Sequence, residues 1–156
     1  MTRITITTFL ALAFSALAAW AQQAPNWVVS CTNAANPGQL ICGASQSVVL
    51  SETGARLLTV EVVKSGGSTR LALVLPLGFL LPEGVQVAVD QSEVLALPVR
   101  TCDAQGCYAQ GELEDAALDA LQSGETVTVS LSNLDGTTLE FNVPLEGFAQ
   151  SYGVMP

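Results

Sequence analysis

Apolar and polar residues alternate in short runs along most of the chain. The clearest run covers residues 56–64, where Leu58, Val60 and Val62 face one side and the residues between them face the other. Alternation over about four to eight residues is typical of a β-strand with one buried face. Turn-forming residues separate the runs at the spacing expected of a β-sandwich or barrel. We expect about eight short strands from nine candidate runs, at residues 27–31, 46–51, 56–64, 69–75, 85–90, 93–101, 108–113, 125–131 and 138–145.

Two glycines mark a tight turn between two of these runs. Ser65-Gly66-Gly67-Ser68 joins residues 56–64 to residues 69–75. Paired glycines accept the positive φ angles that two-residue hairpin turns require. The two runs are therefore predicted to be antiparallel neighbours.

One segment follows a helical period instead. Apolar residues from Leu113 to Leu121 fit the spacing of a helix, with acidic residues on the opposite side. Gly124 is placed to end such a helix. We therefore predict one short helix near residues 114–122. Because strands dominate and no strand–helix–strand alternation occurs, the predicted fold class is all-β, an antiparallel β-sandwich.

The N-terminus has the three parts of a signal peptide. Arg3 gives a basic start, an apolar run covers residues 4–19, and Ala19-Trp20-Ala21 places small residues before a cleavage point. The apolar run is shorter than the roughly 20 residues that a transmembrane anchor needs. We predict that residues 1–21 are removed and that residues 22–156 form a single exported domain. No cysteine follows the apolar run directly, which disfavours a lipid anchor.

Charge and composition exclude several classes of function. Cleavage after Ala21 would leave four basic and fourteen acidic residues, because only Arg3 is lost from a total of five and fourteen. Such a chain repels nucleic acid and anionic headgroups, since both require a basic face. The sequence has no histidine. This excludes Ser-His-Asp and Cys-His catalysis and removes the commonest metal ligand.

Four cysteines fall into two local pairs. Cys31 and Cys42 bracket a turn-rich loop, and Cys102 and Cys107 bracket a second turn. Four cysteines allow three pairings, and turns that bring the members of each pair together favour Cys31–Cys42 and Cys102–Cys107. Export to an oxidising compartment favours disulfides. A zinc site or a redox dithiol is the alternative.

Other reactive side chains fit ordinary structural roles better. Glu112, Glu114, Asp115 and Asp119 could bind a divalent cation, but a solvated helix face explains them more simply. A Ser–Lys dyad at Ser65 is disfavoured, because the adjacent Lys64 would point to the opposite face of its strand. We expect no catalytic residues, no metal and no cofactor.

Several motifs occur together in a fixed order along the chain. They are Trp27, Cys31, Cys42, Pro76-Leu77-Gly78, Thr101-Cys102, Gly106-Cys107 and Gly147-Phe148. With this order, nearly the whole predicted mature chain resembles the invasion-associated locus B family of exported Gram-negative proteins. One departure is Glu146, because a basic residue is expected before Gly147-Phe148.

The resemblance implies an immunoglobulin-like β-sandwich that is periplasmic or surface-associated and has no assigned catalytic residues. It does not imply virulence for this chain, because many relatives occur in free-living bacteria. We expect a non-enzymatic envelope protein that acts through contact with an envelope or host-surface protein, with no nucleic acid partner and no membrane span after cleavage. The alternatives are a periplasmic small-ligand binding module and a hydrolase with paired carboxylates, which needs two buried acids.

Overall fold

A computed structural model describes residues 27–34 and 40–156 of the chain. The predicted signal peptide, residues 1–21, and the predicted mature start at Gln22 lie outside the described residues.

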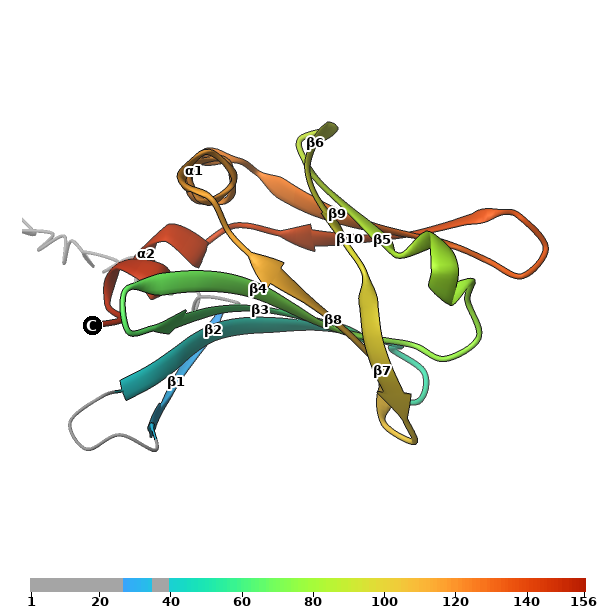
Figure 1. Cartoon of the computed structure of the whole chain (residues 1–156), viewed down its shortest axis with the longest axis horizontal. Coiled ribbons are helices and arrows are strands. Elements are labelled where there is room, and N and C mark those ends of the chain that lie inside the picture. Colours follow the sequence, from blue (N-terminus) through green and yellow to red (C-terminus); the bar gives the residue numbers. More distant parts are fainter. Residues whose placement is uncertain (1–26, 35–39) are drawn as a thin grey trace, which may run out of the picture.

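Two antiparallel sheets pack face to face (Figure 1). The larger sheet has the order β1 (Val28–Asn33), β2 (Leu40–Val49), β3 (Arg56–Ser65), β4 (Ser68–Leu75), β8 (Gly106–Glu112) and β7 (Val99–Asp103). The smaller sheet has the order β10 (Thr138–Pro144), β9 (Thr126–Ser132), β5 (Val85–Val89) and β6 (Ser92–Leu97). The predicted all-β sandwich is confirmed.

The core lies between the sheets and follows from the alternation in the sequence. Leu58, Val60 and Val62 of β3 are fully buried, as the pattern predicts. Alternate residues of the smaller sheet face them, because successive strand residues point to opposite faces. These are Val85, Val87, Val89, Val127, Val129, Leu131, Phe141 and Val143. The burial of this apolar surface is the main favourable contribution to folding.

The predicted hairpin between β3 and β4 is present. β3 ends at Ser65 and β4 begins at Ser68, with positive φ angles of 57° at Gly66 and 88° at Gly67. These angles are those of the turn that follows the right-handed twist of the flanking strands.

Two strand predictions are corrected by the structure. β2 starts at Leu40 rather than at residue 46, because its first half pairs with β1. The small residues in that half show no alternation of apolar and polar positions. The predicted run 93–101 is two strands, β6 and β7, which belong to different sheets. Pro98 stands between them and lacks the N–H group that would continue a ladder.

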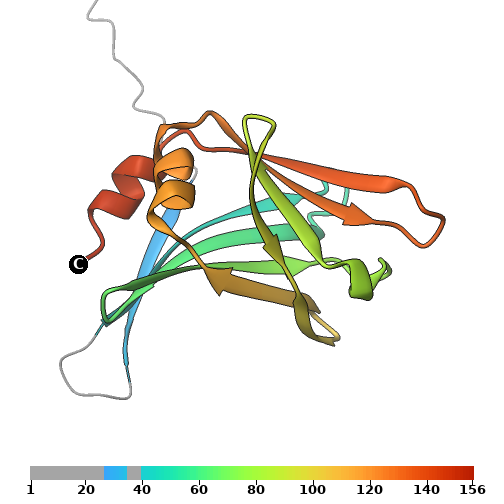
Figure 2. The ribbon, with the colours of Figure 1, turned by 45° about the horizontal axis from the view of Figure 1, so that its top comes forward.

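The helix predicted near residues 114–122 is α1 (Asp115–Ser123). A second helix, α2 (Phe148–Gly153), and the short 3₁₀ helix η1 (Leu81–Glu83) were not predicted. Each is too short to give a period that can be recognised in the sequence. α1 and α2 lie side by side at one end of the sandwich (Figure 2). Among the described residues no helix has the length and apolar character of a membrane span.

Candidate functional site

Two disulfides fasten the edge strands of the larger sheet. Cys31 of β1 is bonded to Cys42 of β2, and Cys102 of β7 is bonded to Cys107 of β8. Each pair joins directly opposite residues of neighbouring strands. The pairing is the local one that the sequence favoured, and it leaves no free cysteine for zinc or for thiol chemistry.

Removing either disulfide is expected to lower the free energy of unfolding, and the loss should be larger for the disulfide that closes the longer loop. The Cys31–Cys42 bridge spans 11 residues and the Cys102–Cys107 bridge spans 5. We expect a loss of about 3 kcal/mol for C31S/C42S and about 2 kcal/mol for C102S/C107S, because a longer loop restricts the unfolded chain more. Urea unfolding without reductant measures both. A larger loss for C102S/C107S would contradict the loop-length argument.

We call the end of the sandwich that carries α1 and α2 the helical end. There Trp27, the first described residue, contacts α2. Trp27 is 1% exposed, and its ring meets that of Phe148 edge-on at 4.8 Å between centroids. Its Nε1 donates a 3.0 Å hydrogen bond to the carbonyl oxygen of Pro144, and Ser151 Oγ donates one of 3.0 Å to the Trp27 carbonyl. Gly147, the residue directly before α2, has a left-handed φ of 84°. Motif residues from both ends of the sequence therefore form one structural cluster.

Lys64 contributes to the same end and not to a catalytic dyad. Its Nζ donates a 3.1 Å hydrogen bond to the Met155 carbonyl and lies 5.3 Å from the centre of the Tyr152 ring. The hydroxyl groups of Tyr152 and Thr69 are 2.9 Å apart. These contacts hold the C-terminal segment on β3 and β4, which gives Lys64 a structural role.

The remaining motif residues meet at the opposite end of the sandwich. Pro76-Leu77-Gly78 follows β4, and Gly106 begins β8 beside it. A Cβ atom at Gly106 would collide with the Leu75 carbonyl oxygen. Gly106 therefore allows the β7–β8 hairpin to approach the end of β4. Leu77, in the segment that follows β4, is 58% exposed.

Four exposed leucines lie on three connections at this end. The loop after β2, the segment between β4 and β5 and the β9–β10 hairpin all project there (Figure 1). A hydrogen bond from Leu80 N to Ser132 O joins the last two. We call this surface the leucine end; its residues are Leu50, Leu77, Leu81 and Leu134, which are 42%, 58%, 45% and 70% exposed.

The carboxylates of the described residues include no buried pair and no cluster that could hold a metal ion. All fourteen lie within the described residues, and none is buried; Glu61 alone is partly covered. No group of three or more possible ligands among residues 27–34 and 40–156 could hold a metal ion. Glu112, Glu114, Asp115 and Asp119 are all exposed, as expected of a solvated face. A hydrolase mechanism with two buried acids has no candidate pair here.

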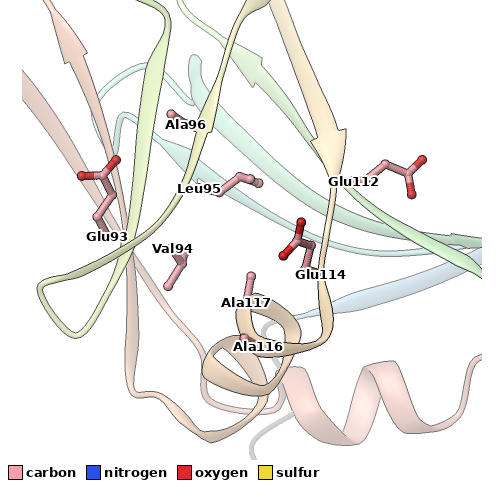
Figure 3. A pocket seen from close by; sticks show the side chains of 8 residues that line it. All are labelled: Glu93, Val94, Leu95, Ala96, Glu112, Glu114, Ala116 and Ala117. Carbon is pink, nitrogen blue, oxygen red and sulfur yellow. The ribbon is translucent and has the colours of Figure 1, made fainter.

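A groove that the sequence did not reveal lies between β6 and α1 (Figure 3). Its volume is about 580 Å³, within the range typical of ligand pockets. We call it the β6 groove; it is lined by Glu93, Val94, Leu95, Ala96, Glu112, Glu114, Ala116 and Ala117.

Two ionisable side chains near the leucine end have shifted pKa values. Loss of solvent, a hydrogen bond to Asp103 and the charge of Asp103 raise the pKa of Tyr108 above 10.0, against a lowering effect of Arg56. Hydrogen bonds from the hydroxyl and then the backbone N–H of Thr137 lower the pKa of Asp135 below 3.8. Asp135 thus fixes the turn between β9 and β10 as a carboxylate.

We expect the Asp135 contribution to stability to be present above its ordinary pKa of 3.8 and to be lost as the pH falls through the lower folded value. Replacing Thr137 by Val removes the hydroxyl donor and keeps the N–H. Its expected result is an upward shift of the Asp135 pKa that stops short of 3.8. A carboxyl-detected NMR titration measures it. T137S is the matched control, and an unchanged pKa in T137V would contradict the assigned cause.

A sequence model of the family described as Invasion associated locus B (IalB) protein matches residues 27–156. The chain belongs to the IalB family. The match begins at Trp27 and includes every motif residue described above. Comparison with curated proteins found no match.

The fold of this IalB family member is also similar to a solved structure. This is the crystal structure of invasion associated protein B from Bartonella henselae, with a TM-score of 0.74 and 20% identity. The superposition covers 85% of this chain and 91% of that chain. At this identity the likeness shows a shared fold, and it supports the two-sheet arrangement described above.

Proposed function

We propose that this IalB family member is exported, works in the periplasm or outside the cell, and acts by contact with another protein rather than by catalysis. Family membership and the two disulfides support an envelope location, because disulfides persist in oxidising compartments. The absence of histidine from the sequence and the lack of a buried carboxylate pair support a binding role.

The observation that carries the proposal is the leucine end. Leu77 and Leu134 project from separate loops and are 58% and 70% exposed. Single exposed leucines are ordinary, but four of them lie on three connections at the same end, and exposed apolar surface of this kind is a feature of interaction sites. Loops held by a rigid sandwich are also the usual position of binding residues.

Site-specific photo-crosslinking in living cells tests the contact. A photoreactive amino acid at Leu77 or Leu134 should give the same crosslinked partner, and L77S/L134S should remove that complex while the protein stays folded. The matched control position is Val154, which is 73% exposed but lies at the helical end. Equal crosslinking from Val154, or no protein adduct from either leucine, would count against the proposal.

Export has a separate test. N-terminal sequencing of the protein from an envelope or culture fraction should begin at Gln22. A chain that retains Met1 in the soluble cytoplasmic fraction would contradict export.

A further inference from the structure

β6 is an edge strand with an unused flank. It pairs with β5 alone. Within the described part of the chain, no further backbone hydrogen bond involves residues 92–97. An edge of this kind presents a row of free N–H and C=O groups, which is a template for another strand. The free flank faces the β6 groove, where α1 and the end of β8 stand apart from β6 (Figure 3).

A bulge places two adjacent apolar side chains on the groove side of β6. The register with β5 passes from Leu95 to Glu93 while β5 advances by one residue, so Val94 is the extra residue. Val94 and Leu95 both point toward the groove, whereas Glu93 and Ala96 point to the other side (Figure 3). Bulges re-aim side chains in this way and are frequent at sheet edges and beside active sites.

The space between β6 and β8 is narrow near Leu97 and wider near Glu93, where α1 lines it. A Cβ atom at Gly111 of β8 would lie 2.5 Å from Leu97 Cδ2, so the Leu97 side chain packs directly on the backbone of β8 there. Toward Glu93 the strands separate, and Ala116 and Ala117 of α1 line the space. Five of the eight lining residues are apolar and none is basic. An extended backbone alongside β6 would satisfy the free flank and bury this apolar wall.

The negative charge of the groove favours a basic occupant. Glu93 and Glu114 stand on its two sides, and Glu114 projects toward the space, while Glu112 points away (Figure 3). The chain carries fourteen acidic and five basic residues. A second copy would bring the same negative charge to this edge, and like charges disfavour association. A cationic segment would be attracted both to the groove and to the whole molecule.

We propose that β6 binds an extended, basic segment of a partner protein, which pairs with its free flank as a fifth strand of the smaller sheet. Residues of the segment point alternately into the groove and away from it, because strand side chains have a period of two. Apolar side chains on the groove side meet Val94 and Leu95, and lysine or arginine side chains on the other side meet Glu93, while Glu114 adds negative charge at the opposite wall of the groove. This inference rests on the proposed binding function and names a second contact site for it.

A defined peptide probes the site. An octapeptide of alternating Lys and Val, blocked at both termini, should bind in fluorescence anisotropy and should slow amide exchange in residues 92–97. The same peptide with alternate backbone nitrogens methylated keeps its charge but cannot pair with a strand. We expect it to bind at least about tenfold more weakly, since several backbone hydrogen bonds are lost.

Variants of the protein separate the groove from the overall charge. E93Q/E114Q should weaken binding of the peptide about three- to tenfold, because the two acidic groups on either side of the bound strand lose their charge. The matched control is E52Q/E140Q, which changes the net charge equally at two exposed residues, one in the β2–β3 loop and one on β10 at the far edge of the smaller sheet. It should retain more affinity than E93Q/E114Q.

Three results would overturn the inference: no binding of the Lys-Val peptide, equal binding of the methylated peptide, or equal effects of the two double variants. The crosslinking experiment distinguishes this outcome from failure of the proposed function. A partner captured at Leu77 and Leu134, together with an empty β6 groove, would leave protein contact intact and remove only the strand-pairing site.

Discussion

Phe148→Ala is expected to lower the free energy of unfolding by about 3–5 kcal/mol, the usual cost of truncating a buried aromatic side chain. Phe148 is completely buried and contacts the rings of both Trp27 and Tyr152. Its loss leaves a cavity under α2, in a small domain whose whole stability is of the order of 5–15 kcal/mol. The expected result is a soluble but strongly destabilised protein.

Trp27 is a direct reporter for this experiment. The chain has two tryptophans, and Trp20 lies within the predicted signal peptide. Fluorescence of Trp27 followed through a urea titration measures unfolding where the deleted ring was in contact, and circular dichroism measures it for the whole sandwich. V154A changes an apolar residue of the same C-terminal segment that is 73% exposed, and should have little effect. A Phe148→Ala loss below about 1 kcal/mol would contradict the contribution assigned to the packing of Phe148 against Trp27 and Tyr152.

The sequence predicted the parts of the fold that depend on neighbouring residues. Alternation placed Leu58, Val60 and Val62 in the core because a strand with one buried face must alternate. Gly66 and Gly67 predicted a hairpin because few other residues accept the required φ angles. Apolar spacing predicted α1 to within a residue at each end.

Features that depend on residues far apart in the chain could not be predicted in the same way. Trp27 and Pro144 are 117 residues apart and are joined by a hydrogen bond that no local pattern indicates. α2 has six residues, fewer than two helical turns, so its apolar positions show no period. The β6 groove lies between β6 and α1, which are separated along the chain by β7 and β8. Only the packed sandwich brings these two elements together.

Two other features have a recognisable signal in the sequence. Pro98 interrupts the run 93–101, and a proline within a run indicates an edge or a break rather than a continuous central strand. Leu77, Leu81 and Leu134 lie among prolines, glycines and polar turn residues. Leucine in such a position has little local reason to be there, and the structure places all three at one exposed end.

Gly106→Ala is expected to cost about 2–6 kcal/mol, because two separate penalties add. The φ of Gly106 is 144°, a region that residues with a side chain rarely adopt, and occupying such a region costs about 1–3 kcal/mol. The new Cβ would also collide with the Leu75 carbonyl oxygen, a backbone atom that cannot rotate away. Forcing an extra carbon into a packed position costs about 1–3 kcal/mol more.

Gly136→Ala separates the two penalties. Gly136 has a positive φ of 81°, but a Cβ atom there would meet nothing within 4 Å. Its substitution should therefore cost about 1–2 kcal/mol, the left-handed conformation alone. Urea unfolding of both variants measures the difference, which reports the approach of the β7–β8 hairpin to the end of β4. Equal losses would mean that this hairpin moves aside freely, and Gly106 would then be explained by its backbone conformation alone.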